Sequence, residues 1–222
     1  MSTTCRAYRE ALYEQFARLT KALAHPKRLL VLDLLLQAPR TVEVLATQLD
    51  ASVASTSQHL QVLRAARLVE AEKKGLYVTY RLADDTVHDL LRDLRVVAGQ
   101  RLAEVEQLRR QVQEQGAHLT RASVAELHQC LDQGDVVVLD VRPAEEYHAG
   151  HLPGAVLMPL DELASRLDEL PRGKLIVAYC RGEDCLMARR AVDLLQQHGY
   201  AARFVEESVR ELQAEGLPLE SA

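Results

Sequence analysis

The chain has 222 residues, of which 48% are hydrophobic, and a formal net charge of −5. It is long for one compact domain and suits two domains of about 100 residues each. No apolar run reaches about 18 residues and the N-terminal residues resemble no targeting signal, so we expect a cytoplasmic protein with no membrane partner. In that reducing compartment we expect free, catalytic or sensory thiols rather than disulfides.

The net charge is divided unevenly along the chain. Residues 1–82 hold 12 Lys and Arg against 7 Asp and Glu, a net charge of +5. Residues 83–222 hold 15 against 25, a net charge of −10. Because a basic region attracts a polyanion and an acidic region repels one, the first part is where a DNA interface is expected.

The first part of the chain has mainly helical periodicity. A helix over 8–24 is followed by one with Pro26 in its first turn, where the missing N–H costs least. Two short amphipathic segments then begin at Thr41 and Ser52, which we expect to be their N-caps. Two β-type runs around Gly75 predict a hairpin whose turn uses a positive φ at this glycine.

A long apolar stripe follows the hairpin. It runs from Asp84 to about Glu114 at helical spacing and is interrupted once, by Gly99. A charged helix with so long an apolar stripe needs a partner helix. The polar run RRQVQEQGAH at its end predicts a domain boundary near Gly116, which separates a first domain at 1–115 from a second at 119–222.

Two short helices, a tight turn and a hairpin with lysines at its tip predict a winged helix-turn-helix, mainly α with a β-hairpin wing. Through residues 8 to about 110, the segments LAHPKRLLVLDLLL, TVEVLATQLDASVASTSQHLQVLRAARLV and KKGLYVTYRL resemble the ArsR (SmtB) family of repressors. This resemblance implies a homodimer built on the first and last helices and bound to double-stranded DNA at an inverted-repeat operator.

The candidate DNA contacts lie on the expected recognition helix and wing. Leu60 and Leu63 should point into the core, whereas short or planar polar groups can approach base edges and phosphates. The lysines of the wing should contact phosphates without regard to sequence. The candidates are Ser55, Thr56, Ser57, Gln58, His59, Arg64, Lys73 and Lys74, with Ser55, Ser57 and Gln58 favoured for bases. The alternative is a solvated helix face in a protein-interaction module.

The ligands with which this family senses metals are not matched. The segment VEVLA has no thiol where the family places cysteines, and Asp85 and His88 lack a second ligand pair. Because a metal needs three or four convergent ligands, we expect no metal site and no cofactor. Cys5 is a lone thiol that is either an inert surface residue or a reactive one.

After residue 119 strands alternate with helices, which predicts a parallel sheet with helices on both sides. One strand ends on a cysteine in KLIVAYCRGEDC, where Cys180 and Cys185 flank a short loop before a helix. Backbone N–H groups and the positive end of the helix dipole converge at such a place. They lower the pKa of a thiol and favour a thiolate, a persulfide or a bound oxyanion.

The segments VVVLDVRPAEEYHAGHLPGAVLMPLDEL and VAYCRGEDC resemble a single rhodanese domain. The resemblance implies an α/β domain with a five-stranded parallel sheet, in which Cys180 takes up a sulfane sulfur as a persulfide. It also implies that the loop beginning with Arg181 wraps around Cys180 and that Asp140 and Arg142 organise this loop.

Two features depart from a thiosulfate-using rhodanese. Glu183 and Asp184 stand beside the nucleophile, and their charges disfavour a dianionic donor such as thiosulfate. Cys185 could bridge to Cys180 or resolve its persulfide. The alternative is that Cys185 is a small buried residue at the start of a helix.

Together these patterns predict a DNA-binding regulator whose second domain senses sulfane sulfur, or another thiol-reactive small molecule, through Cys180. A competing hypothesis is a sulfurtransferase enzyme with an attached DNA-binding domain. A third is an arsenate-reductase-like or oxyanion-binding relative.

Overall fold

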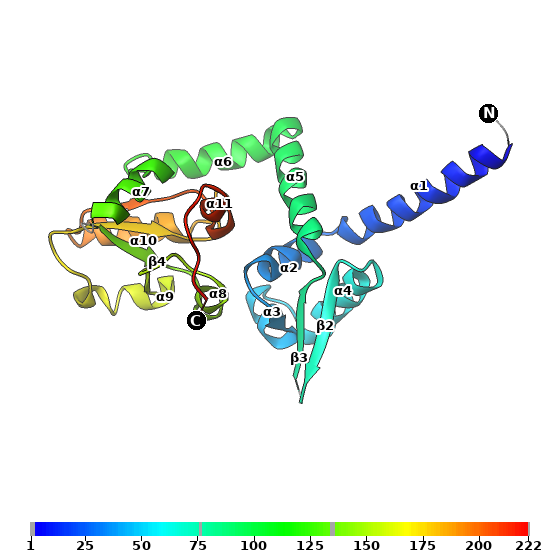
Figure 1. Cartoon of the computed structure of the whole chain (residues 1–222), viewed down its shortest axis with the longest axis horizontal. Helices are drawn as coiled ribbons and strands as arrows, with labels where there is room; N and C mark the ends of the chain where they lie inside the picture. Colours follow the sequence, from blue (N-terminus) through cyan, green and yellow to red (C-terminus); the bar gives the residue numbers. More distant parts are fainter. Residues whose placement is uncertain (1–2, 76, 134–135, 222) are drawn as a thin grey trace. The chain divides into compact units, whose positions relative to one another are not determined.

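The structure is a computed structural model that describes residues 3–75, 77–133 and 136–221, without the side chains of Thr3, Lys74, Cys130, Asp132 and Gln133. The chain divides into two compact units, Met1–Ala98 and Gly99–Ala222 (Figure 1). Within the described ranges, every helix is too short or too polar to span a lipid bilayer.

The first unit has the predicted order of helices and hairpin. Its elements are α1 (Thr3–Leu23), α2 (Pro26–Gln37), β1 (Arg40–Thr41), α3 (Val42–Gln48), α4 (Val53–Ala65), β2 (Val69–Lys74), β3 (Tyr77–Leu82) and α5 (Asp85–Arg101), which continues into the second unit. The three strands form an antiparallel sheet in the order β1-β3-β2. This is a winged helix-turn-helix with β2 and β3 as the wing.

Local chemistry explains where these elements begin. Pro26 occupies the first turn of α2, and the side chains of Thr41 and Ser52 accept hydrogen bonds from the first turns of α3 and α4. Gly75 has φ +64° between the wing strands. These four sequence predictions are confirmed.

One core holds the first unit together. It is formed by α2, α3 and α4 with parts of α1, the wing and α5, and its fully buried residues include Leu32, Leu45, Leu60 and Leu63. The two leucines of α4 thus face the core as predicted. Their burial fixes which face of α4 remains outside.

The long predicted helix is two helices in the structure. The break falls at Leu102, whose φ of −108° and ψ of 104° are extended, and α6 (Ala103–Gln115) starts after it. Gly99 stays inside α5. Because α6 clusters with the second compact unit, the division at Ala98 differs from the boundary near Gly116 suggested by composition. The domain limits 1–115 and 119–222 therefore remain predictions.

The second unit is an α/β domain. Its further elements are α7 (Val124–Gln133), β4 (Val136–Asp140), α8 (Ala144–Ala149), β5 (Val156–Leu157), α9 (Leu160–Leu163), the 3-10 helix η1 (Leu167–Glu169), β6 (Leu175–Tyr179), α10 (Met187–Gln197), β7 (Ala202–Phe204) and α11 (Val209–Ala214). The strands lie in the order β5-β4-β6-β7 and all pairs are parallel.

The expected fifth strand is a single parallel bridge between Arg121 and Phe204 in the described residues. Two backbone hydrogen bonds support it, from Ala122 N to Phe204 O at 2.8 Å and from Phe204 N to Thr120 O at 3.3 Å. The pairing extends no further because Ser123 exchanges hydrogen bonds with Glu126 in the first turn of α7.

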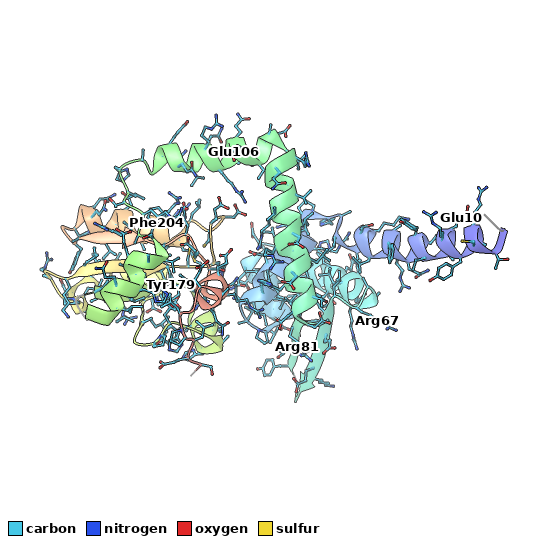
Figure 2. All side chains as sticks on the ribbon, turned by 45° about the horizontal axis from the view of Figure 1, so that its top comes forward. Glu10, Arg67, Arg81, Glu106, Tyr179 and Phe204 are labelled. Carbon is cyan, nitrogen blue, oxygen red and sulfur yellow. The ribbon has the colours of Figure 1, made fainter. Side chains whose placement is uncertain are left out.

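Side chains alternate across this sheet and fill two cores. On β6, Ile176 and Ala178 pack with α9 and α10, whereas Val177 and Tyr179 pack with α7 and α11. Tyr179 and Phe204 mark the sheet in Figure 2. Cys180 follows β6 and belongs to the core on the α10 side. This alternation aims its sulfur toward the start of α10.

Candidate DNA interface and nucleophile loop

Only some of the residues predicted to contact DNA lie on the exposed face of the recognition helix α4. Gln58 and Arg64 are exposed, and Ser55 and Ser57 are half-buried. Gln61 is also exposed, three positions after Gln58, and was not among the predicted contacts. The i, i+3 spacing that places two residues on one helix face is the signal that could have found it.

Thr56 does not lie on this face, and its prediction as a DNA contact is corrected. Its side chain is fully buried, and its Oγ1 has no hydrogen-bond partner among the described residues. The physical reason is helical spacing, since Thr56 stands four residues before Leu60 and therefore shares its core-facing side.

His59 packs against another histidine. Its ring centroid lies 4.5 Å from that of His25, the N-cap residue of α2. Partial burial lowers the pKa of His59, and electrostatic interaction with His25, Arg28 and Lys27 lowers it further. A half-buried imidazole with a lowered pKa that packs against a second ring is a poor phosphate contact.

The wing presents basic groups to solvent. Lys73 is exposed near the end of β2, and the side chain of Lys74 lies outside the described part of the structure. Arg67 has φ +59° in the turn after α4 and is exposed (Figure 2). Arg67 is a further candidate for phosphate contact that sequence reasoning did not include.

The nucleophile loop, defined as Cys180–Leu186, connects β6 to α10. Gly182 has φ +116°, and a Cβ at this position would lie 3.3 Å from the Cβ of Ser208, the N-cap of α11. The backbone conformation thus favours glycine, and a side chain at this position would also crowd Ser208. The N–H of Cys185 donates to Gly182 O at 2.9 Å, which closes a tight turn.

The two thiols of the loop interact with each other. Cys180 is 1% exposed and Cys185 is half-buried, and both are free. The Sγ of Cys180 donates a hydrogen bond to Cys185 O, 3.7 Å away. The loop therefore brings together the pair that the sequence had placed five positions apart.

The electrostatics of the pair favour one thiolate. A second hydrogen bond, from the Cys180 thiol to the sulfur of Cys185, lowers the pKa of Cys185 to about 6, against the opposing effect of burial. Backbone N–H groups of Met187 and Arg181 and the charge of Arg181 act in the same direction. That hydrogen bond and burial raise the pKa of Cys180. The pKa for loss of the first proton from the pair is therefore below that of an ordinary cysteine, and the pKa for loss of the second proton is above it.

Arg181 is fixed by a carboxylate of α8. Its Nε donates to both carboxylate oxygens of Glu146, at 3.1 and 3.0 Å, and Glu146 is fully buried. Glu146 belongs to the quoted rhodanese-like segment but was not predicted as a site residue. Such a charge-assisted, bidentate pair holds the first loop residue after Cys180 in place.

Asp140 and Arg142, which the sequence predicts to organise the nucleophile loop, form a buried network at the ends of two strands. Arg142 donates to Asp140 from Nη2 at 2.6 Å and to Gly150 O at 2.7 Å. Tyr179 donates from its hydroxyl to Asp140 at 2.7 Å. This buried network joins the ends of β4 and β6 to the segment before β5, and so supports the loop through its neighbouring backbone.

Glu183 and Asp184 are not isolated carboxylates. Arg109 of α6 donates from Nε to Asp184 at 2.9 Å and lies 3.4 Å from Glu183. Together with the pair of Arg181 and Glu146, the loop region has three carboxylates against two guanidinium groups. The excess of negative charge beside the thiols is reduced but remains.

The remaining cysteines and possible ligands add no further cluster. Cys5 is exposed on α1, and the side chain of Cys130 lies outside the described part. Across the described ranges there is no group of three or more His, Cys, Asp or Glu side chains placed to hold a metal ion.

Two protein families match this chain, one in each unit. Residues 25–71 match the model for bacterial regulatory proteins of the arsR family, and residues 123–215 match the rhodanese-like domain. The HTH-type transcriptional regulator Rv0324 of Mycobacterium tuberculosis is 41% identical over 210 residues, which cover 95% of this chain and 92% of that protein.

Solved structures resemble each unit separately. The homodimeric winged helix-turn-helix DNA-binding domain of Mb0332 from Mycobacterium bovis is 42% identical, with a TM-score of 0.40, and the match covers 42% of this chain and 86% of that one. A rhodanese-related protein from Thermoplasma volcanium is 25% identical, with a TM-score of 0.42, and the match covers 46% and 99% of the two chains.

A winged helix-turn-helix followed by an α/β domain with a cysteine loop defines a transcriptional regulator with a rhodanese domain. The chain belongs to the ArsR family of transcriptional regulators and carries its rhodanese-like domain in the second unit.

Proposed function

We propose that this regulator is a repressor that releases its DNA operator when sulfane sulfur, or another thiol-reactive small molecule, modifies Cys180 and Cys185. The observation that carries the proposal is the interacting pair of free thiols, one buried and one half-buried, in one loop. The first unit contains one cysteine, the exposed Cys5. The thiol chemistry of the chain is thus concentrated away from the DNA-binding unit.

The sulfur chemistry is a pair of exchange steps. A thiolate of the pair attacks a polysulfide, one S–S bond breaks, and the shortened polysulfide leaves with the electron pair while a cysteine persulfide remains. The second cysteine then loses its proton, and its thiolate attacks the Sγ of the first cysteine, which breaks the bond between this Sγ and the transferred sulfur. Hydrosulfide then leaves with the electron pair, so both cysteines are oxidised to a disulfide and the transferred sulfur is reduced.

The exposure of the two thiols supports an order for these steps. Cys185 is half-buried and its pKa is lowered to about 6, whereas Cys180 is 1% exposed. Incoming polysulfide therefore meets Cys185 first, and Cys180 becomes the second partner. This order reverses the roles that the rhodanese resemblance implies for the two cysteines.

Exposed apolar groups support a homodimer on an inverted-repeat operator. On α1 the side chains of Tyr8, Tyr13 and Phe16 are 68, 59 and 54% exposed. On α5, Val96 and Val97 are 50 and 54% exposed. Apolar faces of this kind mark interaction sites, and a second copy of the chain is the partner that two-fold symmetric DNA requires.

The sensor proposal is tested by fluorescence anisotropy on a DNA duplex that the full chain selects from a random pool. We expect polysulfide to weaken the binding of the wild-type protein and to leave the Cys180→Ser and Cys185→Ser proteins bound. Intact-protein mass on the same samples distinguishes an added sulfur atom from the loss of two hydrogens. Release that is unchanged in both variants contradicts the proposal.

A second candidate function is sulfur transfer as an enzyme. It is supported by the backbone N–H groups of Gly182 and Ala188, which face the sulfur of Cys180 and favour its charged form. The negative charge of the loop region opposes thiosulfate as the donor. The test is the rate of thiocyanate formation from cyanide with thiosulfate or polysulfide, and a rate equal to that of a free thiol contradicts this function.

A further inference from the structure

Arg109 of α6 lies between α5 and the nucleophile loop. Its Nε and Nη2 donate to the two carboxylate oxygens of Asp184 at 2.9 and 3.2 Å. A Cβ built on Gly99 would lie 3.1 Å from Nη1 of Arg109. Glycine is among the least favourable residues inside a helix, so its presence in α5 calls for a reason. A side chain at this position would crowd the guanidinium group of Arg109.

Asp184 directly precedes a reactive thiol. The Sγ of Cys180 contacts Cys185 O at 3.7 Å, and Cys180 is 1% exposed. A bond between the sulfurs of Cys185 and the buried Cys180 therefore requires the backbone at Cys185 to move. Because Asp184 is the adjacent residue, that movement shifts the carboxylate that Arg109 holds.

Space for this movement is present on the same side of the loop. A cavity of about 160 Å³ is lined by Leu108, Arg109 and Val112 of α6 and by Asp184 and Leu186 of the loop, among others. Packed protein interiors resist displacement because they contain few voids. The cavity lets the loop rearrange against α6 without disrupting the core beneath it.

We propose that Arg109 is a positioning residue that couples the sulfur state of the nucleophile loop to helix α6. With both thiols reduced, the ion pair of Asp184 and Arg109 holds α6 against the nucleophile loop. After the two cysteines are bridged, the shifted loop withdraws Asp184 and releases α6. This inference rests on the proposed function, because it states how modification of the loop cysteines would be transmitted to the rest of the chain.

The chain itself carries the signal onward from α6. α5 starts at Asp85 in the first unit, ends at Arg101 in the second, and is followed by α6 after one residue. Loss of the ion pair that holds α6 therefore affects α5, the helix whose exposed valines support dimer formation. Coupling energies between sites usually correspond to changes of about 5- to 150-fold in affinity.

The test compares Arg109→Ala with Arg110→Ala in the full chain. Arg110 is the next residue of the same helix, and its pairing is an exposed contact of 3.8 Å with Glu106. For each protein we measure sulfur uptake by intact mass and DNA affinity by anisotropy, with and without polysulfide. Arg109→Ala should take up the same final amount of sulfur per chain as the wild type, even if more slowly. The factor by which polysulfide lowers its DNA affinity should be at least about 5-fold smaller than in the wild type.

Two outcomes overturn the coupling role while leaving the sensor intact. In one, Arg109→Ala releases DNA on polysulfide as fully as the wild type and Arg110→Ala. In the other, Arg109→Ala fails to take up sulfur, which makes the residue part of thiol reactivity instead. Failure of the sensor itself is distinguishable, because then the wild-type protein keeps its DNA affinity after taking up sulfur.

Amide hydrogen exchange of α6 gives a readout that needs no DNA. Polysulfide should speed exchange in Ala103–Gln115 of the wild-type protein, and in Arg109→Ala the exchange should be fast before treatment. Gly99→Ala, which crowds the guanidinium group at 3.1 Å, should shift exchange in the same direction by a smaller amount. Equal exchange in all three proteins before and after treatment contradicts the proposal.

Discussion

Glu146 and Arg181, which are 35 residues apart in the chain, form a bidentate pair in which Nε of Arg181 donates to both carboxylate oxygens at 3.1 and 3.0 Å. Glu146 is fully buried, and the side chain of Arg181 is 20% exposed. The pair links α8 to the first residue after Cys180. The geometry of the nucleophile loop thus depends on a carboxylate outside it.

The first prediction concerns this pair. Glu146→Gln removes the charge that compensates Arg181, and we expect the free energy of unfolding to fall by about 2 kcal/mol. Urea unfolding followed by circular dichroism measures the change. Glu145→Gln is the matched control, because Glu145 is the exposed neighbour on the same helix and should change stability by less than about 0.5 kcal/mol. Equal effects of the two substitutions would show that the pair adds no stability.

The second prediction concerns the pH dependence of thiol alkylation. Because the pKa of Cys185 is lowered to about 6, its reaction with iodoacetamide should rise through that pH and level off above it. In Cys180→Ala the stabilising thiol hydrogen bond is lost, and the rise should move toward the ordinary cysteine value of about 8.5. Peptide mass spectrometry assigns the reaction to Cys185, and an identical profile in both proteins refutes the role of the hydrogen bond.

The third prediction separates base from phosphate contacts. Gln58→Ala should weaken binding to the selected duplex by about 1–3 kcal/mol and leave binding to random DNA unchanged. Lys73→Ala should weaken both kinds of binding and reduce the salt slope by about 1. Lys21→Ala removes the same charge from an exposed position on α1 and is the control. A salt slope that changes equally in Lys73→Ala and Lys21→Ala would place the phosphate contacts outside the wing.

The fourth prediction tests the corrected role of Thr56. Its hydroxyl is buried without a partner among the described residues, so Thr56→Val should raise the free energy of unfolding by about 1 kcal/mol. DNA affinity should stay the same. Thr47→Val is the control, because the hydroxyl of Thr47 is exposed and donates to Glu43 O at 3.1 Å. A loss of DNA affinity in Thr56→Val, with stability unchanged, would restore Thr56 as a DNA contact.

Short-range features of the fold were predictable from the sequence. The N-caps Thr41 and Ser52, the first-turn Pro26 and the positive φ of Gly75 depend on the residue and its near neighbours alone. The two-unit organisation followed from the change in periodicity. The break at Leu102 was not predictable, because Leu102 fits the apolar stripe of a continuous helix and Gly99 is the usual signal for an interruption.

The candidate site was predictable in its cysteines but not in its supporting side chains. Cys180 and Cys185 stand on one loop, so chain connectivity alone keeps them near each other. Glu146 and Arg109 approach that loop from 35 and 75 residues away, and no local pattern predicts such pairs. The direction of the pKa shifts depends on the mutual hydrogen bonding of the thiols, which is set by the loop backbone.

By itself, the sequence determined the family, the order of elements and the place of the two loop cysteines, because these depend on motifs and on periodicity along the chain. Only the tertiary structure decided that Thr56 faces the core, that Cys185 is the more accessible thiol, and that Arg109 holds Asp184. Burial and ion pairing are properties of the packed chain. They arise when distant segments meet, and they decide which charges and sulfur atoms remain available.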